Sequence, residues 1–221
     1  MRGKTGLACT GAQLPAVSPV RVTKPPQELD DFCQFLNSDD EILLYEQLSG
    51  THSNSQQYYW AILKADDYPL GICELEQYAD WSASQGKWSG RRSDYLAIGS
   101  AQGDCYLVVI ELRHVLVKAS QEDDKFEQLK ETITTLIRHH LPKIQGSTVQ
   151  AAVYSPPPPT YNIIGVMIAP GNTRQFSRSH LNPIVEIESR PVILRTLPKD
   201  ALQDCRVTWT ELLRWLGVNF A

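Results

Sequence analysis

Two apolar segments joined by a short turn constrain the fold of this chain more than any other feature. Residues 93–98 and 106–112 are rich in aliphatic, β-branched and aromatic side chains, and the turn-forming residues 99–104 separate them. A connection this short predicts antiparallel neighbours. The second segment is almost continuously apolar, which is typical of a strand at the centre of a sheet. The chain is therefore predicted to contain a central sheet built around this pair.

Helical periodicity is clearest in three other stretches. Apolar residues within 28–50 recur at the i, i+3 and i+7 spacing, which favours helical structure there. Residues 122–141 carry one apolar stripe with charge on the opposite face, which predicts the best-defined helix of the chain, with Pro142 just past its end. Thr208, followed by Glu211 three residues later, forms a capping box that predicts a last helix.

Apolar runs predict the remaining strands. Residues 58–63 and 70–75 are separated by turn chemistry and are expected to form a hairpin. Further strands are expected at 149–154, 162–169 and 184–194. These elements together predict a mixed α/β or α+β domain, with a central mixed sheet flanked by helices.

The size and composition of the chain suit one globular domain. It has 221 residues, of which 42% are hydrophobic and 21% charged, and this composition excludes collagen-like and wholly disordered classes. Residues 1–26 mix Gly, Pro, Ser and Ala with little periodicity, which predicts a flexible leader. Residues 27–221 are then expected to form the single domain.

Localisation is predicted to be cytoplasmic. No apolar stretch approaches the roughly 20 residues that a membrane helix needs, and the start of the chain lacks the apolar segment of a secretory signal. The five cysteines are scattered without the spacing of a zinc site, and reduced thiols are expected.

Charge is distributed unevenly along the chain. Residues 27–80 contain twelve acidic side chains and one lysine, whereas the formal net charge of the whole chain is only −4. A sequence pI near 5.7 argues against a simple basic DNA-coating protein. The acidic block is interpreted as a solvated face, and an enzyme whose contact surface lies in the later, basic part of the chain remains compatible with it.

Two carboxylates are predicted to converge at one edge of the sheet. Asp94 lies at the start of the first strand of the antiparallel pair, and Glu111 lies at the end of the second. Glu111 follows five apolar residues, where an acid is costly to bury. A hard divalent cation such as Mg²⁺ would neutralise both groups. The alternative is a surface ion pair between Glu111 and Arg113 on the same strand face.

The order of the predicted elements resembles the core of the PD-(D/E)xK nuclease superfamily, which has the restriction-endonuclease-like fold. The resemblance covers about residues 39–155, and residues 160–221 would form a C-terminal extension. Ser93-Asp94 is similar to the first half of the family motif, and Glu111-Leu112-Arg113 is similar to the second. The two acids stand seventeen residues apart, as in many members of the family.

The resemblance implies a metal-dependent nuclease that cuts DNA with Mg²⁺ or Mn²⁺. Asp94, Glu111 and the main-chain carbonyl of Leu112 would bind the metal. Gln128 is similar to a glutamine found in the following helix of several family branches and would support the site. Glu46 could supply the additional acid that some branches take from the first helix.

One departure from the family motif concerns its lysine. Arg113 stands where the family has Lys, and an arginine stays protonated and is bulkier. Either Arg113 contacts the scissile phosphate or the attacking water, or Lys118 or His114 substitutes from nearby, or the site is degenerate.

Nucleic-acid contacts are expected from basic residues close to the two acids in sequence. Lys87, Arg91 and Arg92 precede Asp94, and Lys118 follows the second strand. The alternative for the first three is a solvated basic loop.

Two functions from different classes follow. The first is a nuclease that uses Asp94, Glu111, Arg113 and Gln128, with DNA favoured as substrate over RNA. The second is a catalytically degenerate module of the same fold that binds nucleic acid or serves as a subunit of a larger assembly. A homodimer or another protein partner is compatible with either function.

Overall fold

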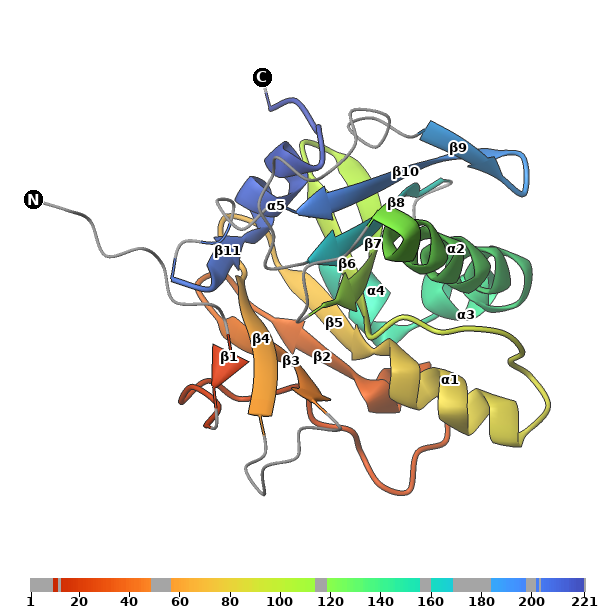
Figure 1. The fold of residues 1–221 in the computed structure, drawn as a ribbon, viewed down its shortest axis with the longest axis horizontal. Helices are drawn as coiled ribbons and strands as arrows, with labels where there is room; N and C mark the ends of the chain where they lie inside the picture. The colour runs from red at the N-terminus through yellow and green to blue at the C-terminus, as the bar shows by residue number, and fades with distance from the viewer. Residues whose placement is uncertain are drawn as a thin grey trace, which may run out of the picture.

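The segment that contains Glu111 lies at the centre of the larger of two β-sheets (Figure 1). The computed structural model describes residues 10–11, 13–48, 57–113, 119–155, 160–168, 184–197, 202 and 204–220. Within these residues the larger sheet has seven strands in the order β2-β5-β6-β7-β8-β10-β9. Their bounds are β2 Cys33–Leu36, β5 Leu70–Glu74, β6 Tyr95–Ala101, β7 Asp104–Leu112, β8 Asn162–Ile168, β10 Arg190–Leu197 and β9 Ile184–Ile187.

The larger sheet is mixed, as the sequence predicts. β6 and β7 pair antiparallel with Tyr95 opposite Ile110, and the turn between them is only two residues long. β7 then pairs parallel with β8, and β8 pairs parallel with β10. The remaining neighbours are antiparallel. The protein is therefore a mixed α+β fold with a mixed central sheet.

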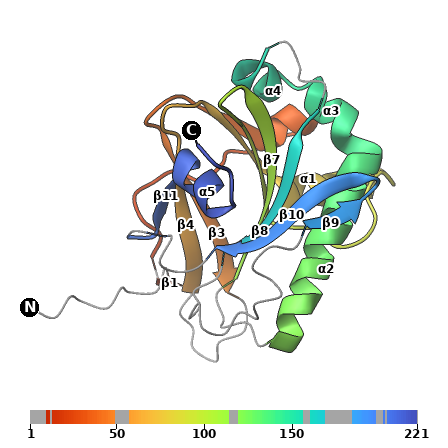
Figure 2. The same ribbon diagram turned by 90° about the horizontal axis from the view of Figure 1, so that it is seen from above.

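A smaller sheet covers one face of the larger one. In the described part of the chain it consists of β1 Thr10–Gly11, β3 Glu41–Leu48, β4 Gln57–Lys64 and β11 Arg206–Thr208, with β4 pairing to all three others. The last helix, α5 Trp209–Trp215, lies on the same side (Figure 2). Apolar side chains from both sheets and α5 form one continuous core cluster between the layers.

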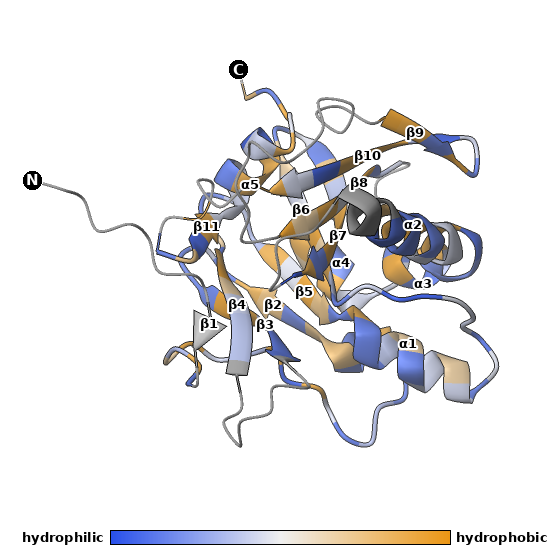
Figure 3. Cartoon of the chain, viewed as in Figure 1, coloured by the Kyte–Doolittle hydropathy of each residue, from blue (hydrophilic) through white to orange (hydrophobic). Residues whose placement is uncertain are grey.

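Helices cover the opposite face of the larger sheet (Figure 2). They are α1 Leu75–Ser84, α2 Ala119–Thr135, a π-helical turn Leu136–His140, α3 Leu141–Gln145 and α4 Thr148–Val153. The side chains of β7 alternate between the two cores, so that Val108 and Ile110 face the smaller sheet while Leu107 and Val109 face the helices. Hydrophobic colour in Figure 3 is accordingly concentrated on the central strands.

The long helix predicted over 122–141 is confirmed and continues further than expected. It runs from α2 through the π-helical turn into α3. Pro142 does not follow the end of the helix but lies in the first turn of α3, where its missing N–H is tolerated. The capping box at Thr208 and Glu211 is confirmed at the start of α5.

Two secondary-structure predictions are wrong. The helical prediction for 28–50 is replaced by a short 3-10 turn, η1 Leu29–Phe32, and the strands β2 and β3. The predicted strand at 149–154 is instead α4, which begins after Ser147, whose hydroxyl accepts a hydrogen bond from the Gln150 N–H. Pairing of β3 with all eight residues of β4 decides the first case, because a complete ladder outweighs a weak helical spacing.

The predicted hairpin of 58–63 and 70–75 is also wrong, although both strands exist. β4 belongs to the smaller sheet and β5 to the larger one. The chain turns directly from β5 into α1. The strand after α2 that lies parallel to β7 is β8, so the sheet extends well beyond residue 155.

Two points of the predicted leader contact the rest of the domain. Val20 is buried in the core between the sheets, and Pro19 bridges to Leu43. The Thr23 N–H donates a hydrogen bond to the Asp31 carbonyl. Residues 1–9 and 12 lie outside the described residues.

The expectation of reduced thiols is wrong for three cysteines. Cys33 and Cys73 stand directly opposite each other on β2 and β5 and form a disulfide. Cys205 is also disulfide-bonded, and Cys105 is a buried thiol. Among the described helices, none combines the length and the apolar character that a membrane crossing requires.

Candidate functional site

Asp94 and Glu111 line the same cavity, where the start of β6 lies beside the end of β7. The β6–β7 register brings the start of one strand to the end of the other. The Asp94 carbonyl accepts hydrogen bonds from the N–H groups of Leu75 and Glu76, which tie it to the first turn of α1. Its carboxylate Oδ2 accepts a 2.6 Å hydrogen bond from the Leu112 N–H. The cavity has a volume of about 450 Å³.

The two carboxylates lie in an environment that disfavours negative charge. Glu111 is only 3% exposed, and burial is the main reason that its pKa is raised. Burial also raises the pKa of Asp94 well above its usual value, with a second contribution from the charge of Glu111. Protonation or a nearby cation therefore stabilises each of these carboxyl groups.

Three further acids line this cavity. Glu46 comes from β3, Glu74 from the end of β5 and Glu76 from α1. Burial raises the pKa of Glu74 to about 7. Glu46 was expected on a helix, and the structure places it on a strand but in the same cavity as the predicted pair. Among the described residues the lining carries five carboxylates and two cationic side chains, Arg113 and Lys125.

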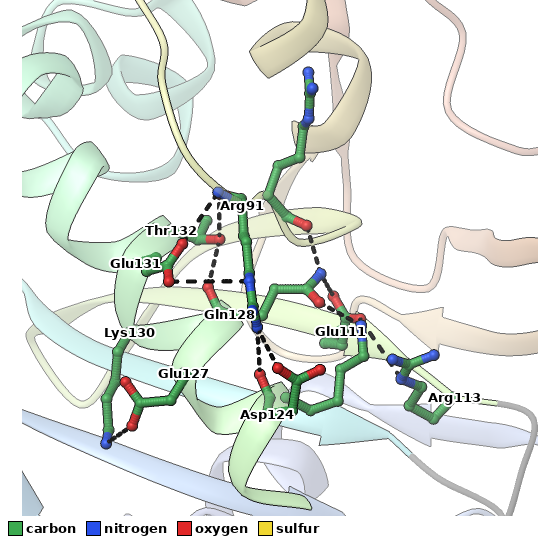
Figure 4. Close-up of polar contacts among 11 residues, drawn as sticks. Arg91, Glu111, Arg113, Asp124, Glu127, Gln128, Lys130, Glu131 and Thr132 are labelled. Carbon is green, nitrogen blue, oxygen red and sulfur yellow. Dashed lines mark hydrogen bonds and ion pairs between the residues drawn. The ribbon is translucent and has the colours of Figure 1, made fainter. Parts of the chain in front are cut away.

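α2 contributes two side chains that contact Glu111 directly. The Gln128 amide Nε2 donates to Glu111 Oε2 at 2.9 Å and to the Arg92 carbonyl at 2.6 Å. The Lys125 ammonium lies 2.9 Å from Glu111 Oε1 and also hydrogen-bonds Gln128 Oε1. Both oxygens of Glu111 thus have donors from one face of one helix (Figure 4).

Sequence reasoning selected Gln128 but missed Lys125. The available signal was the spacing, because a residue three positions before Gln128 lies on the same helical face. The sequence does not show how far this face is turned toward the strand, so the contact with Glu111 could not be derived.

Arg113 lies beside Glu111 without a hydrogen bond to it. Its Nε stands 3.8 Å from Glu111 Oε1, and its side chain is 22% exposed. The ion pair considered as an alternative therefore exists, but Lys125 is the closer partner. His114 and Lys118, the other substitutes considered for the family lysine, lie outside the described residues.

The basic residues before Asp94 do not gather in the cavity. Arg91 pairs with Asp124 at 2.6 Å and, more distantly, with Glu131, on the exposed side of α2 (Figure 4). Arg92 forms an ion pair with Asp80. Lys87 bonds Gln85 and lines different cavities, next to His140 and Tyr78.

The two carboxylates can bind a hard divalent cation only if waters or main-chain carbonyls supply its other ligands. Among the described residues there is no cluster of three or more His, Cys, Asp or Glu side chains that could hold a metal ion. Asp94 and Glu111 are oxygen donors, and Mg²⁺ is commonly bound through one or two carboxylates with waters completing its coordination. The excess of carboxylates over cations in the cavity also favours a bound cation.

Comparisons with known proteins do not assign the chain to a family. No protein-family model, curated protein or solved structure matches it.

Proposed function

We propose that this protein is a metal-dependent nuclease of the PD-(D/E)xK superfamily, with a restriction-endonuclease-like core, which hydrolyses phosphodiester bonds of DNA. The observation that carries the proposal is the convergence of Asp94 and Glu111, from adjacent strand ends, in one acidic cavity. The succession of β6, β7, α2 and the parallel strand β8 supports it. The Glu111-Leu112-Arg113 triplet at the end of β7 supplies the sequence half of the resemblance.

In this proposal the cavity residues have different roles. Asp94, Glu111 and the Leu112 carbonyl would hold Mg²⁺ or Mn²⁺, which supplies an activated water and stabilises charge on the phosphate. The Leu112 N–H fixes one Asp94 oxygen, and Gln128 fixes the rotation of Glu111. Arg113 is partly exposed beside them and would contact the scissile phosphate through its guanidinium N–H groups.

A second candidate is a degenerate nuclease-fold module that binds nucleic acid or serves as a subunit of an assembly. The observation that favours it is the state of Glu111, whose two oxygens are already bonded by Lys125 and Gln128. Arg113 in place of the family lysine is consistent with this candidate as well.

The test is cleavage of supercoiled, linear and single-stranded DNA, and of RNA, with Mg²⁺ or Mn²⁺. The variants are Asp94→Asn and Glu111→Gln, which remove charge but keep shape. Glu127→Gln is the matched control, since Glu127 lies on α2 but is 56% exposed and forms its ion pair with Lys130. We expect both site variants to lose more than about 100-fold in cleavage rate, beyond the range for outer-shell partners of a metal, and the control to keep wild-type activity.

Absence of cleavage by the wild-type protein on every substrate, with nucleic-acid binding intact, would favour the degenerate module. Arg113→Lys then becomes the informative variant, because it restores the triplet of the family. Cleavage that persists in both Asp94→Asn and Glu111→Gln would exclude this cavity as the active site.

A further inference from the structure

The ammonium of Lys125 already occupies the position beside Glu111 that a cation would neutralise. Its Nζ lies 2.9 Å from Glu111 Oε1, and the side chains of the pair are 14% and 4% exposed. The second ammonium contact is to the amide oxygen of Gln128, a neutral group. Glu111 is therefore the only anionic partner of Lys125 among the contacts that the structure describes.

One carboxylate oxygen cannot fully stabilise a lysine ammonium and a divalent cation at the same time. Two positive charges that share one buried oxygen repel each other strongly, because the surroundings screen charge less than water does. Burial also makes the charged ammonium of Lys125 costly when neither Glu111 nor another anion is beside it. Metal binding at Glu111 therefore requires Lys125 to turn toward a new anion.

The anion that suits this role is a phosphate of the substrate. A lysine ammonium is a point charge with three donors on a flexible stem, so it moves between acceptors easily. Asp94, which lines the same cavity, is a poor alternative because the proposed function uses it as the second carboxylate ligand of the metal. Arg113 is the more distant cation, since its Nε is 3.8 Å from Glu111 Oε1.

We propose that Lys125 is an internal counter-ion of Glu111 that divalent metal displaces and substrate phosphate accepts, so that metal and nucleic acid bind cooperatively. This rests on the proposed function, because it takes Glu111 as a metal ligand. It assigns Lys125 a positioning role between two ligands. In the free protein the ammonium weakens metal binding, and in the complex with nucleic acid it strengthens phosphate binding.

The experiment measures Ca²⁺ affinity by titration calorimetry, with and without a mixed-sequence DNA oligonucleotide, single-stranded and as its duplex. Ca²⁺ is a hard cation with oxygen ligands, and its affinity is read without any turnover. The variants are Lys125→Met, which removes the charge, and Lys125→Arg, which keeps it. Lys130→Met is the matched control, because Lys130 lies on the same helix and pairs with Glu127 on its exposed face.

Wild-type protein should bind Ca²⁺ more tightly when DNA is present, by a factor within the 5- to 150-fold range that is roughly typical of coupled sites. Lys125→Met should bind Ca²⁺ about 10-fold more tightly than wild type without DNA and show little further gain with DNA. Lys125→Arg and Lys130→Met should keep the wild-type coupling. Melting temperatures of all variants check that each is folded.

The outcomes distinguish a failure of the counter-ion role from a failure of the proposed nuclease function. Equal Ca²⁺ affinity of wild type and a folded Lys125→Met overturns the counter-ion role and leaves the metal site standing. Absence of any effect of DNA on wild-type Ca²⁺ affinity overturns the transfer to phosphate. Absence of Ca²⁺ binding in every variant overturns both proposals, and binding that survives Glu111→Gln places the metal elsewhere.

Discussion

The imidazole of His140 is a buried neutral group on the π-helical turn that follows α2. It is only 1% exposed, its Nδ1 lies 2.8 Å from the Tyr78 hydroxyl, and its Nε2 lies 3.2 Å from the Lys87 carbonyl. One tautomer satisfies both contacts, with Nε2–H donating to the carbonyl and Nδ1 accepting from the tyrosine. Burial, followed by the charge of Lys143, lowers the pKa of His140 to about 4.

This lowered pKa predicts that His140 destabilises the protein in acid. Between pH 6.5 and about 4 the unfolded chain takes up a proton at this residue and the folded chain does not, so stability falls as pH falls. The full loss is about 3 kcal/mol if the whole shift is realised. Urea unfolding at pH 7.5, 6.0 and 5.0 should show a smaller loss for His140→Gln than for wild type.

Other groups require a matched control for that measurement. Glu74, Asp94 and Glu111 have raised pKa values, so their protonation adds stability as pH falls and opposes the histidine. The difference between variant and wild type isolates residue 140. His139→Gln, at the exposed neighbouring position, should follow the wild-type curve. Parallel curves for His140→Gln and wild type would show that the imidazole does not govern this loss.

At the residue scale, the sequence predicts the acids of the site better than its cations. The short turn fixes the register of β6 and β7, and with it the convergence of Asp94 and Glu111. The position of Lys125 depends on how α2 is rotated over the sheet, which is set by tertiary packing. The ion pairs that hold Arg91 away from the cavity depend on the same rotation.

At the element scale, long or bounded patterns are predicted correctly and short ambiguous ones are not. β7, β8 and α2 have many apolar residues of one period, and all three exist where the sequence places them. The segment 149–154 is too short for periodicity to separate strand from helix. Its assignment is decided by the Ser147 cap and by packing of Val149 and Val153, which are both buried.

The docking of α4 on β5 can be tested through Gly71. A Cβ at this glycine would overlap Val149 Cγ1, so Gly71→Ala should destabilise by about 1–3 kcal/mol through overpacking. Val149→Ala removes the methyl groups responsible and should largely cancel that effect in the double variant. We expect a coupling energy of about 1 kcal/mol or more by denaturant unfolding.

Gly146→Ala is the control for glycine replacement as such, because a Cβ there comes no closer than 3.4 Å to another atom. Its effect should stay within about 0.5 kcal/mol. Additive effects of Gly71→Ala and Val149→Ala would mean that α4 does not rest on β5 at this point.

At the scale of the whole molecule, the layered structure could not be predicted from local pattern. The sequence indicates a sheet flanked by helices, and the structure has helices on one face and a second sheet on the other. β4 and β5 follow each other closely in sequence, which favours a hairpin, yet they separate into different sheets. β4 pairs instead with β3 and, in parallel, with β11 from a distant part of the chain.

Trp209 holds the far end of the chain against the larger sheet. Its side chain is fully buried, and its indole N–H donates a 3.0 Å hydrogen bond to the Ser100 carbonyl of β6. The ring lies where any side chain at Gly99 would overlap it. Asp66 accepts a 2.9 Å hydrogen bond from the Thr210 N–H and fixes the first turn of α5. One tryptophan therefore links α5, the smaller sheet and the larger sheet.

Replacement of this tryptophan should destabilise the whole domain rather than α5 alone. Trp209→Ala is expected to lower the free energy of unfolding by about 3–5 kcal/mol, because it leaves a large cavity between the layers. Trp215→Ala changes the same residue type in the same helix, but Trp215 is 45% exposed, and we expect less than about 1 kcal/mol. Guanidinium unfolding of both variants measures the difference. Equal losses would mean that α5 is not anchored by Trp209, and a second transition in Trp209→Ala alone would mean that the two sheets unfold separately.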